Sequence, residues 1–304
     1  MEHVQVLIAG GGIGGLSAAI WCQRLGLSCL LVEKADRLGG QLLHIHNELW
    51  DFPPRVYSQG SELLDELLHH PAIHRLDPRL EEAVVAIDPH ERIITTTKTS
   101  YRADYLIIAT GVSPNHIPAL DGCPCVLPTS FSTTAQAARV TGQEIAVVGG
   151  GDRALESAVN LSKYASHVHL LVRKNQLRAR SQWKSRAEAL PNLSIWWETE
   201  IAAYEARSGK IALMLQAGRP DSPSEITVDW ILPRIGVHGN SDAFPMLGTF
   251  GDSYLQTDGF QRAGSPWIYA LGDVCNGAPY ASLSLAVGQA MKAVKHISLQ
   301  IQQP

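Results

Sequence analysis

The chain has 304 residues, of which 45% are hydrophobic and 18% charged, and its formal net charge at pH 7 is -4. This length is sufficient for two domains, each with a hydrophobic core of its own. The small negative net charge gives no electrostatic sign of nucleic-acid binding, so we expect no nucleic-acid partner. No apolar run is long enough to span a bilayer, and the chain enters a strand at once, so we expect no signal peptide and a cytoplasmic location.

The first thirty-odd residues predict a strand, a glycine-rich turn, a helix and a second strand, in that order. Gly10, Gly12 and Gly15 have the GxGxxG spacing, and Glu33 follows the second strand. Glycines allow the backbone to approach a pyrophosphate, and the helix N-terminus adds amide donors and the positive end of a dipole. An acid at the end of the second strand can accept hydrogen bonds from a ribose. We therefore predict a dinucleotide-binding Rossmann unit here.

The middle of this first unit predicts short strands at residues 82–88 and 92–97, followed by an apolar strand at 105–109. Such a pattern is typical of a small antiparallel meander that returns to the first sheet. Near the C-terminus, another apolar strand precedes a Gly-Asp pair and a long helix with a small-residue face.

A second glycine-rich unit begins near residue 144, with Gly149, Gly151 and Ala154 in the GxGxxA form. Where the first unit has Glu33, this unit has Arg173, followed by Lys174 and Arg178 (at this position a cation can pair with a 2'-phosphate). These basic residues therefore predict that the second site binds NADP(H) rather than NAD. The alternative is that they form an ordinary solvated basic surface.

Five cysteines are too few and too irregular for a secreted disulfide framework, and no Cys or His cluster has the spacing of a metal site. Cys123 and Cys125 are separated only by a proline. In an extended chain their side chains share a face, with Cα atoms about 6.5–7 Å apart, near the upper limit of about 6.8 Å for a disulfide. A strained bond of this kind would be easily reduced, which suits a redox pair; the alternative is two unconnected loop thiols. Cys22 and Cys29 are interpreted as small buried hydrophobic residues.

Four further motifs are "GGQL" at 39–42, "ATG" at 109–111, "VRKNQLRA" at 172–179 and "GDV" at 272–274. In order along the chain, these motifs and the two glycine-rich fingerprints resemble the thioredoxin-reductase-like, low-molecular-weight flavoprotein disulfide reductases. The resemblance spans essentially the whole chain. It implies an α/β fold with two Rossmann-like, three-layer ββα nucleotide-binding domains, the second inserted into the first. The FAD-binding domain would comprise residues 1–112 and 239–304, and the NAD(P)H-binding-like domain residues 113–238. It also implies a homodimer.

The same resemblance implies which residues contact the cofactors, with Asp273 bonding the ribityl chain of FAD. The implied FAD contacts are Gly10, Gly12, Gly15, Glu33, Lys34, Gly40, Gln41, Leu42, Val84, Ala109, Thr110, Gly111 and Asp273. The implied NADP-site contacts are Gly149, Gly151, Arg173, Lys174 and Arg178.

Several positions depart from the family pattern. The CxxC of thioredoxin reductases aligns with Ser-Thr-Thr-Ala at residues 132–135, and a histidine of the nicotinamide nucleotide site aligns with Val172. An Arg-Gln pair aligns with Ala281 and Ser282, and a flavin-contacting asparagine aligns with Asp51. The phosphate and ribose contacts are intact, so FAD binding is expected, whereas ordinary thioredoxin reductase activity is not.

We therefore predict an FAD-dependent oxidoreductase that exchanges electrons between its flavin and a dithiol or disulfide, with Cys123 and Cys125 as the catalytic pair. The partner would be a dithiol or a small electron-carrier protein. One alternative resembles the ferredoxin–NADP reductases and passes electrons from NADPH to a carrier; another is a non-catalytic flavin-binding redox sensor. The missing CxxC also fits the diflavin-linked disulfide oxidoreductases, which would imply two FAD molecules per chain instead of one.

Overall fold

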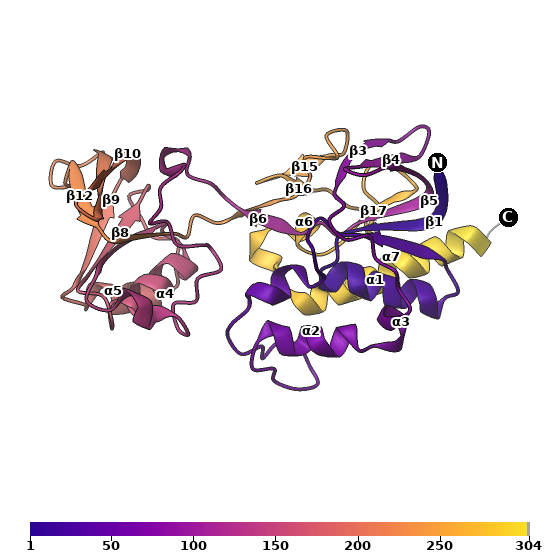
Figure 1. Ribbon diagram of the computed structural model, residues 1–304, viewed down its shortest axis with the longest axis horizontal. Helices are drawn as coiled ribbons and strands as arrows, with labels where there is room; N and C mark the ends of the chain where they lie inside the picture. The colour runs from indigo at the N-terminus through magenta and orange to yellow at the C-terminus, as the bar shows by residue number, and fades with distance from the viewer. Residues whose placement is uncertain (303–304) are drawn as a thin grey trace. The chain divides into compact units, whose positions relative to one another are not determined.

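The computed structural model describes residues 1–302, which form two compact units (Figure 1). Unit 1 consists of Met1–Ser113 and the chain from Val237 onward, and unit 2 consists of Pro114–Gly236. Unit 2 is therefore inserted into unit 1, as the fold class predicted. The two passages between the units pair as a two-stranded sheet of β6 (Val112–Pro114) and β14 (Val237–Gly239).

Unit 1 contains a six-stranded mixed sheet in the order β2-β1-β5-β4-β3, with β17 also paired to β5. The strands β1, β2, β5 and β17 are parallel, whereas β3 and β4 form the antiparallel meander that the sequence predicted. The strand β5 begins at Ser100 rather than at residue 105, because its first residues pair with β4 at the polar edge of the meander. The bounds are β1 (Glu2–Ala9), β2 (Cys29–Val32), β3 (Val84–Asp88), β4 (Ile93–Thr96), β5 (Ser100–Ile108) and β17 (Ile268–Ala270).

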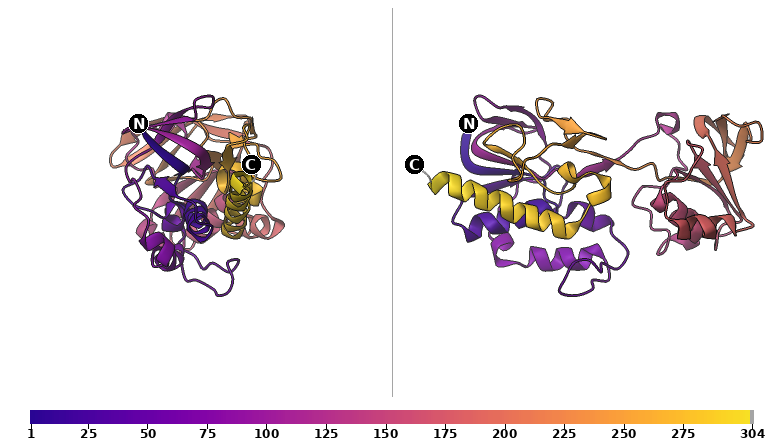
Figure 2. Two further views of the ribbon diagram at one scale, coloured as in Figure 1. Left: turned by 90° about the vertical axis from the view of Figure 1, so that its right-hand side faces the viewer. Right: turned by 180° about the vertical axis from the view of Figure 1, so that it is seen from behind.

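Each face of this sheet buries a separate apolar cluster. On one face α1 (Ile13–Arg24) and α7 (Leu283–Gln302) lie side by side, as both panels of Figure 2 show. Small buried residues such as Ala18 and Ala290 allow these two helices to pack closely. The other face is covered by the segment between β14 and β17, whose buried side chains include Phe244, Leu255 and Trp267.

Unit 2 has the three-layer ββα arrangement that the sequence predicted. Its central sheet is four-stranded and parallel, in the order β13-β7-β8-β9. The helices α4 (Asp152–Leu161) and α5 (Ser181–Glu188) cover one face, and a three-stranded antiparallel sheet β10-β11-β12 covers the other. The bounds are β7 (Glu144–Val148), β8 (His167–Val172), β9 (Leu193–Trp197), β10 (Thr199–Arg207), β11 (Lys210–Ala217), β12 (Glu225–Val228) and β13 (Trp230–Pro233).

Short elements complete the two units. Two of them carry sequence motifs: the 3-10 helix η1 contains "GQL", and α6 begins at Asp273. Within residues 1–302, no helix is both long and apolar enough to cross a membrane. The short elements are η1 (Gly40–His44), α2 (Gly60–Leu68), α3 (Pro71–His74), η2 (Pro118–Leu120), η3 (Ala137–Val140), β15 (Thr249–Phe250), β16 (Tyr254–Leu255), α6 (Asp273–Asn276) and η4 (Ala278–Tyr280).

Candidate functional site

The glycine-rich turn of unit 1 lies where three parallel strands end together. Gly10 follows β1 with a φ of 110°, and its amide donates to the carbonyl of Val32 at 2.8 Å. A side chain at Gly10 would overlap the carbonyl oxygen of Ala109, which follows β5. Only glycine satisfies both the positive φ and the close approach at this position.

The N-terminus of α1 presents an open, uncompensated positive end. Gly12 caps the helix, and a methyl group placed on Gly12 would meet only the Cα of Gly40, at 4.0 Å. The first turn of α1 contains no acidic residue. Since free amide groups and the helix dipole both favour an anion here, the turn fits the pyrophosphate of a dinucleotide.

Glu33 is positioned at this turn by the backbone. Its side chain is buried, and its carboxylate accepts the amide of Gly11 at 2.5 Å and the amide of Ala35 at 2.8 Å. Each carboxylate oxygen retains a further lone pair, so the group can still accept a ribose hydroxyl. The segment that leads to Val84 runs beside Glu33, because the Glu82 amide donates to the Glu33 carbonyl at 2.8 Å. Lys34 is exposed, and Val84 is half-buried against the sheet.

The "GGQL" motif lies against the same turn. The amide of Gly39 donates to the carbonyl of Gly11 at 2.9 Å, and Gly40 has a φ of 51°. A methyl group on Gly40 would approach the Cα of Gly12 to 3.1 Å, so the two backbone segments are nearly in contact. Leu42 is buried and anchors the motif to the core, while the Gln41 amide donates to the carbonyl of Val112 at 3.3 Å.

The "ATG" segment is fixed by a residue that sequence reasoning missed, Asn240. Thr110 donates its hydroxyl to the Asn240 carbonyl at 2.8 Å, and the Asn240 side chain donates to the Thr110 carbonyl at 2.8 Å. The Asn240 amide also donates to the carbonyl of Gly111 at 3.0 Å. Only the Gly-Asn sequence at the second passage between the units could have indicated this role. Ala109 is tied to β1 through the carbonyl of Ala9, at 2.8 Å.

Asp273 begins the short helix α6 at the end of β17. Burial raises the pKa of its carboxyl group, and a hydrogen bond from the Ser282 backbone opposes that rise. The preceding Gly272 donates its amide to Gln289 of α7 at 2.8 Å, and Gln289 also donates to Asn276 at 2.6 Å. Gln289 is a second missed residue, because a buried amide on an otherwise apolar helix face gives no sequence signal of its partners.

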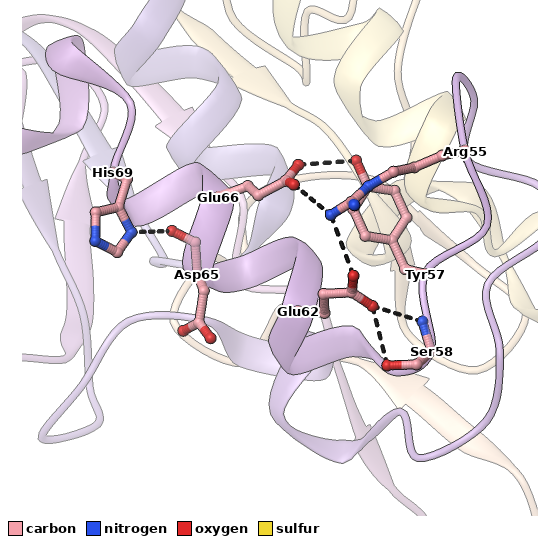
Figure 3. Close-up of polar contacts among 7 residues, drawn as sticks. All are labelled: Arg55, Tyr57, Ser58, Glu62, Asp65, Glu66 and His69. Atoms are coloured by element: carbon pink, nitrogen blue, oxygen red, sulfur yellow. Dashed lines mark hydrogen bonds and ion pairs between the residues drawn. The ribbon is translucent and has the colours of Figure 1, made fainter.

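A polar network holds the loop at residues 45–59 against α2 (Figure 3). Arg55 pairs with Glu62 at 3.1 Å and with Glu66, which also accepts the hydroxyl of Tyr57 at 3.1 Å. Ser58 donates both its amide and its hydroxyl to Glu62, at 2.7 and 2.9 Å. This loop carries Asp51, whose carbonyl accepts the hydroxyl of Ser284 at the start of α7, at 2.8 Å. The network therefore fixes a segment in which the family pattern is altered.

The glycine turn of unit 2 differs from that of unit 1 in its charge. Gly149 has a φ of 141°, and a side chain there would overlap the carbonyl oxygen of Arg234. Gly151 has free space around it, but Asp152 in the first turn of α4 places an acid at the helix N-terminus. Asp152 is partly neutralised by Arg180, at 3.2 Å.

The predicted 2'-phosphate cations follow β8 on the surface of unit 2. Arg173, Lys174 and Arg178 are exposed, and none of them forms an ion pair within the part of the chain that the structure describes. The backbone amide of Arg178 donates to the carbonyl of Gly150 at 2.8 Å, which connects this segment to the glycine turn. The arrangement can attract a phosphate next to the turn.

The Cys123–Cys125 segment runs along the edge of the unit 2 sheet. The carbonyl of Cys125 accepts the amide of Ile231 in β13 at 2.9 Å, and both thiols are free and half-buried against the cluster between the two sheets. Burial raises the pKa of Cys125, and the charges of Cys123 and Asp229 raise it further. The segment pairs with the amino end of β13, whereas Gly149 contacts Arg234 beyond its carboxyl end.

The segment that aligns with the family CxxC forms a hydrogen-bonded turn. Ser132 accepts the amide of Ala135 at 3.1 Å, and its hydroxyl lies 3.0 Å from that of Thr134. The guanidinium of Arg234 donates to the carbonyls of Thr129 at 2.9 Å and Phe131 at 2.7 Å. Burial lowers the pKa of Arg234 to about 10. These hydrogen bonds hold the turn in place, although it contains neither of the cysteines that the family has at these positions.

Comparison with known proteins decides the family. Residues 4–296 match the pattern of the pyridine nucleotide-disulphide oxidoreductases. The chain belongs to this family. It is thus an FAD-dependent oxidoreductase of the thioredoxin-reductase-like type, as the sequence predicted, and a non-catalytic sensor is not retained.

Two relatives illustrate the likeness in sequence. A thioredoxin reductase of Streptomyces coelicolor is 30% identical over 88% of this chain and 85% of its own length. A ferredoxin–NADP reductase of Rhodospirillum rubrum is 27% identical over 90% of this chain and 84% of its own length. Both relatives align with nearly the whole oxidoreductase.

Two solved structures illustrate the likeness in fold. A thioredoxin reductase from Lactococcus lactis has a TM-score of 0.80 and 24% identity, covering 99% of this chain and 100% of its own. A bacillithiol disulfide reductase from Staphylococcus aureus has a TM-score of 0.77 and 20% identity, with 100% of both chains covered. At these identities the neighbours establish the two-domain Rossmann-like fold of this oxidoreductase.

Proposed function

We propose that this flavoenzyme exchanges electron pairs between FAD and a dithiol or disulfide, with Cys123 and Cys125 as the reacting thiols. The observation that carries the proposal is the placement of both thiols, separated by a single residue and half-buried against the same apolar cluster of unit 2. Burial raises the pKa of Cys125, and the charge of the neighbouring Cys123 raises it further. Both are also half-buried rather than fully enclosed, which leaves them within reach of a partner.

The raised pKa of Cys125 assigns different tasks to the two thiols. At neutral pH Cys125 stays protonated and is a poor nucleophile, because the thiolate is the reactive form. Cys123 is therefore proposed as the thiol that meets the partner. Asp229, which contributes to the raised pKa, is paired with Lys210 at 3.5 Å.

The proposed thiol exchange balances as follows. The Cys123 thiolate attacks one sulfur of a partner disulfide, a mixed disulfide forms, and the partner's first thiolate leaves. Cys125 then loses its proton and attacks the Cys123 sulfur, which closes the internal disulfide and releases the partner's second thiolate. Two electrons have passed to the partner. Bound FAD would supply a centre that returns two electrons to the Cys123–Cys125 disulfide. When the partner is instead a dithiol, the same exchange runs in the opposite direction: the partner is oxidised to its disulfide, and the Cys123–Cys125 disulfide is reduced.

FAD would be held by the residues that surround the first glycine turn. Gly12 and the N-terminus of α1 would receive its pyrophosphate, and Glu33 would accept its ribose hydroxyls. Asp273 is proposed to bond the ribityl chain.

Serine substitutions test the proposed pair. Cys123→Ser and Cys125→Ser should each abolish flavin turnover that depends on an added dithiol, while both variants keep their FAD. Ser132→Ala, in the turn that aligns with the family CxxC, should leave this turnover unchanged. Trypsin provides a direct readout, because Cys123 and Cys125 lie in one fragment, residues 103–139. In the oxidised enzyme this fragment should be lighter by two hydrogens and unreactive to alkylation; full turnover in either serine variant would sink the proposal.

A second candidate function is favoured by the basic segment that follows β8. Arg173, Lys174 and Arg178 are exposed beside the second glycine turn, and a relative that matches this chain is a ferredoxin–NADP reductase. In this account NADPH reduces the flavin, and a small carrier protein accepts the electrons without the cysteines. Anaerobic bleaching of the flavin by NADPH in the Cys123→Ser variant would support it, and no bleaching with the wild-type enzyme would exclude it.

The number of FAD molecules per chain and the number of chains in the assembly are proposed from the resemblance to the thioredoxin-reductase-like enzymes. We propose a cytoplasmic homodimer that binds either one FAD per chain or, if it belongs to the diflavin-linked group, two. Release of the flavin by denaturation, with chromatographic identification and counting against protein, distinguishes these two values. Sedimentation analysis of the holoenzyme tests the dimer.

A further inference from the structure

A buried amide on α7 connects that helix to both ends of α6. The buried residues of α7 are apolar except for Gln289 and Ser298, and Gln289 is only 9% exposed. Its Oε1 atom accepts the amide of Gly272, the residue before α6, at 2.8 Å. Its Nε2 atom donates to Asn276, the last residue of α6, at 2.6 Å. One side chain therefore reaches across the whole of this short helix.

The helix α6 depends on such contacts for its position. It has four residues, which make a single turn, and so short a helix is not stable without tertiary packing. Gly272 and Gly277, which flank it, both have a φ of 74°, so the chain turns sharply at each end. The thiol of Cys275 donates to the carbonyl of Gly272 at 3.3 Å and closes the turn from within. Gln289 adds the connection to the rigid frame of unit 1.

We propose that Gln289 is a positioning residue of the FAD site, which holds α6 so that Asp273, its first residue, can meet the ribityl chain. The inference rests on the proposed contact between Asp273 and FAD, and it is independent of Cys123 and Cys125. Because Gln289 is buried, it acts through α6 and not on the cofactor itself.

The polar groups around α6 have few alternative partners. Without Gln289, the amide of Gly272 would lose its acceptor and Asn276 would lose its donor. The Nδ2 atom of Asn276 is already buried without a hydrogen-bond partner among the described residues, so this side chain offers no second anchor. Since an unpaired buried amide is costly, α6 would have to move until water reaches it, and Asp273 would move with α6. Bound FAD should then leave the protein faster.

The test measures how fast FAD leaves the holoenzyme, from the rise of free-flavin fluorescence after dilution. Gln289→Met keeps the size of the side chain but lacks the amide donor and acceptor, and FAD release should quicken about tenfold or more. Ser298→Ala is the matched control, because it removes the other buried polar side chain of the same helix, whose hydroxyl accepts from Gln302 at 3.4 Å. Its release rate should equal that of the wild type. Equal rates in the two variants would overturn the proposal.

A conservative variant separates positioning from general helix packing. In Gln289→Glu one carboxylate oxygen can still accept the amide of Gly272. Rotation of the Asn276 amide would bring its unpartnered Nδ2 donor to the other oxygen. We therefore expect FAD release close to the wild-type rate. Release as fast as in Gln289→Met would show that these hydrogen bonds do not position the site.

A second variant keeps the test open if Gln289→Met does not fold, which thermal unfolding would reveal. Asn276→Ala removes only the contact at the far end of α6, and Asn276 is half-buried. FAD release should quicken severalfold in this variant, less than in Gln289→Met. A wild-type rate here would count against the proposal in the same way.

A double-mutant cycle distinguishes failure of this inference from failure of the Asp273 contact. An unchanged release rate in Asp273→Ala would show that Asp273 does not bind FAD, and both proposals would fall. Faster release in Asp273→Ala but not in Gln289→Met would leave the contact standing and reject the positioning role. If both variants release FAD faster, adding Gln289→Met to Asp273→Ala should have little further effect, because Gln289 acts through Asp273. Additive effects would reject that dependence.

Discussion

A side chain at Gly15 would occupy the position of the carbonyl oxygen of Gly10. The first turn of α1 therefore lies directly against the turn that begins it, and the dinucleotide cradle depends on a contact between two backbones. A clash with a backbone oxygen cannot be relieved by moving a side chain.

We expect Gly15→Ala to destabilise unit 1 by about 1–3 kcal/mol or more and to abolish FAD retention, since overpacking against rigid backbone forces the helix to move. The measurement is flavin absorbance per chain together with the thermal unfolding temperature. Gly288→Ala is the matched control, because a methyl group at this exposed position in α7 meets nothing within 4 Å. It should stabilise the helix by about 0.5–1 kcal/mol. Similar flavin content in the two variants would contradict this account.

The carboxylate of Glu33 accepts two backbone amides, and Glu33→Gln should disturb both the turn and the cofactor. A glutamine amide group has two donor hydrogens where the turn provides further donors, Gly11 and Ala35. We expect FAD affinity to fall at least tenfold, which corresponds to about 1.4 kcal/mol. Asp36→Asn, an exposed neighbour, should leave the affinity unchanged. Titration of the apoprotein with FAD measures both, and equal affinities would show that Glu33 is not a cofactor contact.

The basic residues after β8 should set the preference between nicotinamide cofactors. Replacement of Arg173 and Lys174 together by alanine should lower the rate of flavin reduction by NADPH about tenfold or more, since each charge-assisted contact to a phosphate contributes about 1.5–3 kcal/mol. Reduction by NADH should change little. Lys163→Ala, an exposed cation elsewhere in unit 2, serves as the control. Parallel losses with both cofactors would argue that the segment does not recognise a 2'-phosphate.

The stability of the enzyme should fall as the pH drops below about 6.5. Burial lowers the pKa of His169, and the charge of His167 lowers it further, while Glu144 opposes the shift. Below the ordinary histidine pKa, His169 binds a proton in the unfolded chain but not in the folded one, so acidification favours unfolding. Above that pKa, His169 is neutral in both states and does not make the stability depend on pH. His296 in unit 1 acts in the same direction, again through burial.

Thermal unfolding between pH 7.5 and 5.5 measures this slope. His169→Gln should flatten it without removing it, because His296 still contributes. The glutamine oxygen can also replace the ring nitrogen that accepts the Trp196 indole at 3.1 Å. An unchanged slope in the variant would assign the acid sensitivity to other groups.

Local motifs made much of the fold predictable from the sequence. The spacing of Gly10, Gly12 and Gly15 reflects a strand, a turn and a helix that are consecutive along the chain, and the second unit repeats this pattern. Glu33 was predictable for the same reason, since β2 follows α1 directly. The antiparallel meander was also predictable, although β5 begins earlier than the apolar pattern suggested, because its first half pairs at a polar edge.

The parts that could not be predicted depend on contacts between distant segments. Thr110 and Asn240 exchange hydrogen bonds although they are 130 positions apart. The pairing of Cys125 with the amino end of β13 likewise depends on which residue the loop meets.

The two passages between the units have a consequence for how this enzyme could be divided. In unit 2 the amide of Asn115 donates to the carbonyl of Gly236 at 3.0 Å, so the second and the last residue of the insertion are neighbours. In unit 1 the amide of Asn240 meets the carbonyl of Gly111 in the same way, at 3.0 Å. Removing the insertion would leave a gap that a few glycines can bridge. We therefore expect that the gene for this chain can be rearranged into two shorter reading frames: one encodes unit 2 alone, and the other encodes unit 1 with its two pieces joined where the insertion was removed.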